Sequence, residues 1–279
     1  MYCDTWNLTV NISKTKVVVF SRGKIRKKPV FYFGDKLIEV AEGYSYLGVQ
    51  FNFNNKFNKS KALQVNQAQR ALYSLLTKSR NLQLPSDLQL QLFDQLVLPV
   101  LLYGWEIWGF EDLKIMESFQ LKFFKNILRV NKYTPNCMVY GELGRHKLNN
   151  TVDVRMVSFW GRLVNGSAHK LSCMMYRLLR TLHDKKIYSS PWILKVHSVF
   201  NNTGLSYIWD TSIMNHPSFY SRSTLFPVSY IKSVMTQRVG DIYKQEWLSE
   251  VNTNSQCLIY RIFKKKLELE KYLKILNMR

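Results

Sequence analysis

The side chains whose types and spacing best suit a chemical task are cationic. Polar residues recur at intervals of three or four positions between Leu113 and Val130, and four of them are basic. They are Lys114, Ser118, Lys122, Lys125 and Arg129. A helix with this spacing gathers these side chains on one face, and such a face can hold the phosphates of a polyanion without reading a sequence. The same pattern also serves as an ordinary solvated face, so both interpretations stay open.

The acidic residues are poorly arranged for catalysis by metal ions. Phosphoryl transfer with two divalent metals needs a cluster of carboxylates, and Glu111-Asp112 is the only adjacent pair of acids. Neighbouring residues of a helix point about 100° apart, and acids just before a helix stabilise its N-terminus. We therefore expect helix-start acids here, with no catalytic residue and no metal ligand. The chain also lacks a Gly-Lys-Ser/Thr phosphate loop and a Gly-x-Ser-x-Gly motif.

The cysteines and histidines form no recognisable ligand set. Cys3, Cys137, Cys173 and Cys257 lie far apart, without Cys-x-x-Cys, so neither a zinc site nor a disulfide framework is indicated. We expect reduced thiols in an intracellular protein, nuclear or cytoplasmic and not secreted. The histidines lack a partner within sequence reach, and each is expected to be structural or on the surface. They are His146, His169, His183, His197 and His216.

The balance of charge favours a polyanionic partner. The net charge is +21, and acids are absent from three long stretches, 43–86, 118–141 and 154–183. Because neutralising phosphates releases condensed counterions, nucleic acid is the first candidate and an anionic membrane surface the second. A hydrophobic content of 46% indicates a folded protein. The longest apolar run, 96–103, is shorter than the ~20 residues of a membrane-spanning helix.

A small β region is expected at the front of the chain. β-Branched and aromatic residues predict strands at 15–20 and 44–53 and a hairpin at 30–40. The Gly34-Asp35 pair suits the two-residue turn of that hairpin. Gly48, which is isolated within the last strand, indicates a bulge or a close approach of backbone.

Almost everything after residue 58 is predicted to be helical. Apolar residues follow helical spacing at 65, 68, 72 and 75 and again at 116, 119, 123 and 127. Ser86 and Gln89 have capping-box spacing. Further helices are expected at 152–164, 169–182, 227–249 and 261–276. The fold class is therefore α+β, a small antiparallel sheet followed by a mainly helical body. The predicted domains are 1–57, 58–145 and 146–279, with linkers near 184–191 and 201–224.

Several short motifs occur in one order along the chain. They are Trp6-Asn-Leu-Thr-Val-Asn11, Lys14-Thr15-Lys16 with Val-Val-Val-Phe after it, Tyr46-Leu47-Gly48, Pro99-Val-Leu-Leu-Tyr-Gly104, Gly141-Glu-Leu-Gly144, and Tyr260-Arg-Ile-Phe263 followed by Glu270-Lys-Tyr-Leu273. In this order the sequence resembles reverse transcriptases of non-LTR (LINE-type) retrotransposons. The resemblance implies a C-terminal fragment of such an RNA-directed DNA polymerase, with the end of the palm, the thumb and the downstream helical region.

The resemblance also implies contacts with template and primer. In the family, the strand matched by Tyr46-Leu47-Gly48 lies beside the primer near the catalytic centre, and thumb helices contact the template-primer backbone. We therefore predict residues that bind RNA and DNA, namely Lys14, Lys16, Tyr46, Leu47, Gly48, Arg70, Lys78, Lys114, Lys122, Lys125 and Arg129. For Tyr46 and Leu47 the alternative is simple packing of the sheet.

The family's catalytic Ala-Asp-Asp motif has no counterpart in this sequence. The chain alone is therefore predicted to be inactive and to have no cofactor of its own, although magnesium is expected for the intact polymerase. The alternative function is an inert helical remnant with a structural or interaction role and no nucleic-acid ligand. Membrane-surface binding ranks last, because the basic residues are spread over many elements. The sequence does not indicate an oligomeric state.

Overall fold

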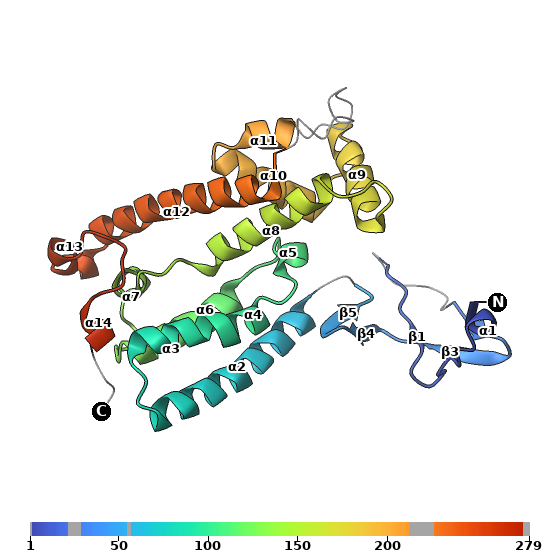
Figure 1. Ribbon diagram of the computed structural model, residues 1–279, viewed down its shortest axis with the longest axis horizontal. Helices are drawn as coiled ribbons and strands as arrows, with labels where there is room; N and C mark the ends of the chain where they lie inside the picture. The colour runs from blue at the N-terminus through green and yellow to red at the C-terminus, as the bar shows by residue number, and fades with distance from the viewer. Residues whose placement is uncertain (1, 22–28, 55–56, 212–225, 276–279) are drawn as a thin grey trace. The chain divides into compact units, whose positions relative to one another are not determined.

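The computed structural model describes residues 2–21, 29–54, 57–211 and 226–275 (Figure 1). The chain divides into two compact units, Met1–Asn66 and Gln67–Arg279. The α+β prediction is confirmed, because a small β region precedes a mostly helical body. The predicted domain boundaries near residues 57 and 145 stay predictions.

The first unit contains a short helix and two small sheets. Its elements are α1 (Tyr2–Thr5), β1 (Lys16–Val17), β2 (Phe31–Phe33), β3 (Lys36–Val40), β4 (Gly43–Tyr46) and β5 (Val49–Asn52). Strand β3 lies between β1 and β2, parallel to β1 and antiparallel to β2, while β4 and β5 form a second, antiparallel sheet. The expectation of one antiparallel sheet is therefore corrected in two respects: the described residues of this unit form two sheets, and one pairing is parallel.

The strand predicted at 15–20 is shorter than expected. Lys16 and Val17 pair with β3 in parallel register. The chain then leaves β3, and the N–H of Ser21 donates to the carbonyl of Phe53 at 3.2 Å. The length of β1 is thus set by where its partner strand ends and not by the run of valines after it.

Two-residue turns close both hairpins. Gly34-Asp35 joins β2 to β3 as predicted, with a φ of 58° at Gly34. Leu47-Gly48 joins β4 to β5, and both residues have positive φ, 48° and 81°. A type I′ turn needs positive φ at both positions, which glycine adopts without strain. The prediction of a continuous strand at 44–53 with a bulge at Gly48 is therefore wrong, since this segment is a hairpin with the turn at its centre.

The second unit is built from helices. They are α2 (Asn58–Asn81, which begins in the first unit), α3 (Ser86–Leu92), the π-helix η1 (Phe93–Val97), α4 (Leu98–Leu101), α5 (Trp105–Trp108), α6 (Lys114–Ile127), α7 (Asn136–Leu143), α8 (Leu148–Val164), α9 (Leu171–Asp184), α10 (Pro191–Asn202), α11 (Ser206–Asp210), α12 (Val228–Thr253), the 3₁₀ helix η4 (Ser255–Cys257), α13 (Tyr260–Phe263) and α14 (Tyr272–Ile275). Helix α8 packs against α5, α9, α10 and α12 (Figure 1). The indoles of Trp105, Trp160 and Trp247 are fully buried in the core of this unit.

The predicted faces of α2 and α6 are confirmed. The buried apolar positions are Ala68, Leu72, Leu75, Met116, Phe123 and Ile127. Val65 and Phe119 belong to the same stripes and are half-buried. The polar positions opposite the stripe of α2 are exposed, and these are Gln67, Arg70, Ser74 and Lys78. Burial of one stripe on each helix therefore turns the other face outward.

The predicted capping box at Ser86 is wrong. Pro85 occupies the N-cap position of α3, and no side chain of the cap bonds to the helix. Gln89 instead donates from Nε2 to the carbonyl of Leu84 at 2.8 Å. The first turn of α3 is therefore tied to the preceding loop through Gln89.

The late helix predicted at 261–276 is two short helices, α13 and α14. Between them the buried Lys264 donates from Nζ to the carbonyl of Glu268 at 2.8 Å and pairs with Glu270. The N–H of Glu270 donates to the carbonyl of Glu142 at 3.0 Å. These contacts hold the chain across the end of α7, which is incompatible with one continuous helix.

The other helix predictions are confirmed as α8, α9 and α12. The predicted linker near 184–191 corresponds to the loop between α9 and α10. The one near 201–224 includes the end of α10 and all of α11, and residues 212–225 lie outside the described part. No helix in the described ranges is long and apolar enough to cross a membrane.

A cluster of rings joins α9, α10 and α11. The indole of Trp209 stacks on the ring of His197, with 5.0 Å between centroids, and lies 3.8 Å from the carbon of the buried Arg180 guanidinium. The ring of His183 is 5.5 Å from that of His197, and its Nδ1 lies 2.7 Å from Oγ of Ser189. Burial, and then the charges of His183 and Arg180, lower the pKa of His197. The expectation of structural histidines is confirmed for these two, whereas His216 lies outside the described residues.

Replacing Leu47 by Asn is expected to stabilise the β4–β5 hairpin. A left-handed conformation costs an L-residue roughly 1–2 kcal/mol, and Asn-Gly is a preferred pair for a type I′ turn. Amide hydrogen exchange in β4 and β5 of the full chain should slow by about fivefold or more. The control is Leu37→Asn, which replaces an exposed leucine of β3 and should not slow exchange there. Unchanged or faster exchange in Leu47→Asn would contradict the assignment of strain.

The lowered pKa of His197 predicts a loss of stability in acid. An unfolded histidine titrates near pH 6.5, and the folded pKa lies below that value. The contribution of His197 is therefore complete above about pH 6.5 and falls as the pH drops towards the folded pKa. The groups that face it are Arg180, His183, Asp184 and Asp210. The melting temperature, followed by circular dichroism between about pH 7.5 and pH 5, should drop less in His197→Gln than in the original chain.

The comparison between variants matters because other groups act in the opposite sense. Burial raises the pKa of Glu117 and of Asp153, and such acids favour the folded state more as the pH falls. His169→Gln, at an exposed position, is the control and should keep the original pH dependence. An equal drop in His197→Gln and the original chain would show that His197 does not contribute.

Candidate nucleic-acid interface

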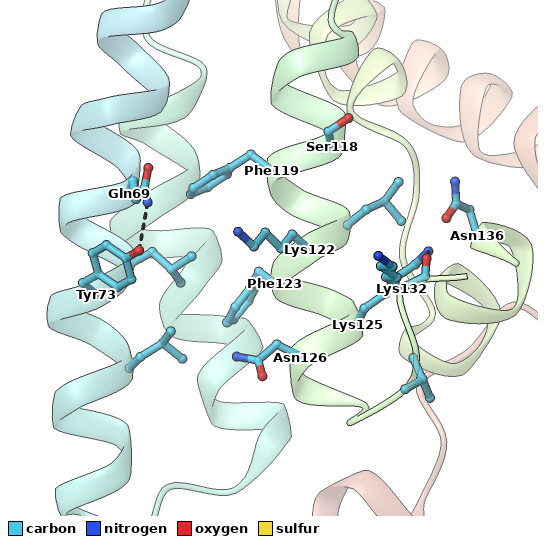
Figure 2. Close-up of a pocket in the computed structure, with 14 residues that line it drawn as sticks. Gln69, Tyr73, Ser118, Phe119, Lys122, Phe123, Lys125, Asn126, Lys132 and Asn136 are labelled. Carbon is cyan, nitrogen blue, oxygen red and sulfur yellow. Dashed lines mark hydrogen bonds between the residues drawn. The ribbon is translucent and has the colours of Figure 1, made fainter. Parts of the chain in front are cut away.

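A groove of about 750 Å³ lies over the outward face of α6, in the second unit. The C-terminal part of α2 and the segment that follows α6 complete it (Figure 2). The residues that line it are Gln69, Leu72, Tyr73, Leu76, Ser118, Phe119, Leu121, Lys122, Phe123, Lys125, Asn126, Val130, Lys132 and Asn136. Among these described residues three are lysines and none is acidic, so the groove has a positive charge.

One side of the groove lies between α6 and α2. Phe119 and Lys122 project from α6 toward Gln69 and Tyr73 of α2 (Figure 2). Gln69 donates from Nε2 to Oη of Tyr73 at 2.9 Å, which fixes the orientation of the phenol. Tyr73 is nevertheless 60% exposed. This side therefore presents an aromatic ring, an amide and an ammonium group together.

The other side of the groove lies between α6 and the segment that leads to α7. Here Lys125 lies beside Lys132 and Asn136 (Figure 2). Lys125 donates from Nζ to the carbonyl of Lys132 at 2.7 Å, and partial burial lowers its pKa. The Nζ of Lys132 in turn lies 4.9 Å from the ring centroid of Tyr133. An anion bound here would therefore meet two ammonium groups, one of which is held in place.

Aromatic packing behind α6 sets the orientation of its outward face. The ring of Phe123 stacks on that of Phe93 in η1, with 4.5 Å between centroids and 15° between planes. Phe124 meets Tyr140 of α7 edge-on at 6.2 Å. All four rings are buried. Since these contacts fix the rotation of α6 about its axis, they also fix where Lys122 and Lys125 project.

The acids around α6 have structural partners. Oδ1 of Asp112 accepts the N–H of Lys114 at 2.9 Å, so the expectation of a helix-start acid is confirmed for Asp112. Oε2 of Glu117 accepts the N–H of Leu148 at 2.8 Å, and burial raises the pKa of Glu117. In the part of the chain that the structure describes, no three His, Cys, Asp or Glu side chains lie together so as to hold a metal ion.

The structure brings two of the six predicted helical cations into the groove, Lys122 and Lys125. The other four are exposed and lie outside its lining; they are Arg70, Lys78, Lys114 and Arg129. Arg129 lies two residues beyond the end of α6 and has a left-handed φ of 52°. Lys114 has its Nζ 3.5 Å from the carboxylate of Asp112, so part of its charge is compensated.

The remaining predicted residues belong to the first unit. Tyr46 and Leu47 are 60% and 71% exposed, so the alternative that they pack the sheet is wrong. Gly48 is also exposed and completes the turn. Lys14 is exposed, whereas Lys16 has its Nζ 3.0 Å from the carboxylate of Glu39 on the neighbouring strand. The charge of Lys16 is therefore partly compensated by Glu39.

Five polar groups of the groove are not singled out by the sequence pattern, and they are Gln69, Tyr73, Asn126, Lys132 and Asn136. One feature of the sequence, the absence of acids from long stretches, does include all of them. All fourteen lining residues come from 43–86 and 118–141, which are two of the three stretches without acids. Spacing alone does not identify Tyr73 as part of the site, because its role depends on how α2 packs beside α6.

Comparisons with known proteins indicate a link to a transposon-derived protein. No protein-family model matches the chain, and no solved structure matches it. The chain is 32% identical, over 116 residues, to an uncharacterized transposon-derived protein of Caenorhabditis elegans. The aligned part covers 39% of this chain and 39% of that relative. The chain therefore shares a segment with a protein of transposon origin.

Proposed function

We propose that the chain is the C-terminal part of a LINE-type reverse transcriptase and that it binds RNA and DNA through their phosphate backbones, without polymerisation. The observation that carries this proposal is the groove over α6, whose lining comes entirely from stretches without acids. The ordered motifs and the transposon-derived relative support the origin.

The arrangement of cations suits a phosphate backbone. Lys122, Lys125 and Lys132 line the groove, and Arg129 is exposed just beyond the C-cap of α6. With a rise of 1.5 Å per residue, Lys114 to Lys125 extends roughly 16 Å along the helix. Each phosphate that these groups neutralise releases counterions, which gives an affinity that depends on salt and not on base sequence.

The β4–β5 turn is a second proposed contact. Tyr46 and Leu47 are exposed at the end of this hairpin, and the turn backbone at Gly48 carries no side chain. A glycine there allows the backbone of a primer strand to approach closely. This turn would contact nucleic acid in addition to the groove over α6.

The distribution of acids supports the proposal of binding without polymerisation. The single adjacent pair is Glu111-Asp112, and Asp112 bonds to the start of α6. The full chain, given a primed template, magnesium and nucleotides, is therefore expected to extend no primer.

The test of binding is charge reversal at α6. The triple variant Lys122→Glu, Lys125→Glu and Arg129→Glu should weaken binding of a labelled RNA–DNA hybrid at least tenfold, as measured by fluorescence anisotropy over a series of salt concentrations. The slope of log affinity against log salt should fall by roughly 2–3, since each lost phosphate contact removes about 0.9.

The matched control reverses three exposed cations away from the groove, with Lys185→Glu, Lys232→Glu and Arg238→Glu. It changes the net charge by the same amount and should keep most of the affinity and the slope. Equal losses in the two variants would mean that only total charge matters. Unchanged affinity in the α6 variant would favour the alternative, an inert helical remnant without a nucleic-acid ligand.

A further inference from the structure

The groove contains more than a backbone contact requires. Lysines can hold phosphates on a flat surface, yet this groove is hollow and has an apolar part. The apolar side chains between α2 and α6 include Leu72, Leu76, Phe119 and Phe123. A volume of about 750 Å³ falls within the range of about 300–1,000 Å³ that is usual for sites that enclose a small molecule. The shape and lining therefore indicate that a part of the ligand enters the groove.

The aromatic groups favour a flat ligand. Phe119 projects from α6 toward Tyr73 on α2 (Figure 2). Phe119 is half-buried and Tyr73 is 60% exposed, so a ligand can still cover ring surface that now faces water. Stacking of a base on an aromatic side chain is tolerant of sequence, because every base has a π-face.

Amide groups beside these rings can pair with the edge of a base. Gln69 and Asn126 both line this side of the groove. A carboxamide offers a donor and an acceptor. The Nε2 of Gln69 donates one hydrogen to Oη of Tyr73, which leaves its second N–H and its oxygen for a ligand.

We propose that the groove binds single-stranded nucleic acid, with an unpaired base against Tyr73 and Phe119 and the neighbouring phosphates on Lys122 and Lys125. This inference rests on the proposed function and specifies its substrate class. A duplex keeps its base faces stacked inside, whereas a single strand can turn a base outward. Of these two forms, the single strand is therefore the one that can fill the apolar part of the groove.

The charge and the chemistry together favour nucleic acid over an acidic peptide. Both ligands would satisfy the lysines, but a run of carboxylates would leave the rings and the apolar floor uncovered. A polyglutamate peptide is therefore a suitable competitor, and it should displace a nucleic acid far less well at equal charge.

The experiment uses the full chain and three labelled ligands of matched phosphate number: a 20-nucleotide single strand, a 10-base-pair duplex and a 20-nucleotide abasic strand. We expect the single strand to bind on the order of tenfold more tightly than the abasic strand and also more tightly than the duplex. Tyr73→Ala should remove most of this preference. Phe119→Leu, which keeps an apolar side chain, should reduce it. Tyr103→Ala, at a half-exposed tyrosine outside the groove, should retain it.

The outcomes separate this inference from the proposed function. Equal binding of abasic and intact strands, with affinity still lost on reversal of Lys122, Lys125 and Arg129, would overturn base insertion and leave backbone binding standing. Displacement by polyglutamate at equal charge would also overturn it. Loss of both the charge effect and the strand preference would overturn both.

Discussion

The stacked rings of Phe93 and Phe123 decide which way α6 faces. Both rings are almost completely buried, and a helix that buries one stripe must turn the opposite stripe to solvent. A shift of one residue in that contact would rotate α6 by about 100° and move Lys122 and Lys125 out of the groove. The orientation of the positive face therefore depends on the apolar packing of the same helix.

Much of the helical body could be predicted from the sequence, because the spacing of apolar residues is a local property. The stripe of α6 and the hairpin at Gly34-Asp35 depend on residues within a few positions of each other. The predictions are wrong where contacts between residues distant in the sequence determine the local structure. Leucine does not favour a positive φ, so the sequence does not predict a turn at Leu47. The pairing of β4 with β5 imposes that turn. Lys264 likewise lies in a segment with helical composition that its contacts near α7 hold in another form.

The candidate site was predictable in part for the same reason. Lys122 and Lys125 follow from the periodicity of one helix. Tyr73 belongs to another helix, and its place opposite Phe119 is settled only by packing. The pairing of Lys16 with Glu39 depends on a parallel register between strands that lie 23 residues apart in the chain. The sulfur atoms of Cys137 and Cys257 lie 3.5 Å apart although 120 residues separate them in the chain. The spacing of residues in the sequence does not predict this contact either.

Helix α7 has a further property that concerns the synthesis of the chain. Its Cys137 carbonyl accepts the indole N–H of Trp247 at 2.8 Å, across 110 residues, and both residues belong to one buried apolar cluster. A ribosome adds about 5–20 residues per second, so α7 is made roughly 5–20 s before the residue that covers it. During that interval the nascent chain presents an uncovered apolar helix, which is the kind of surface that chaperones bind.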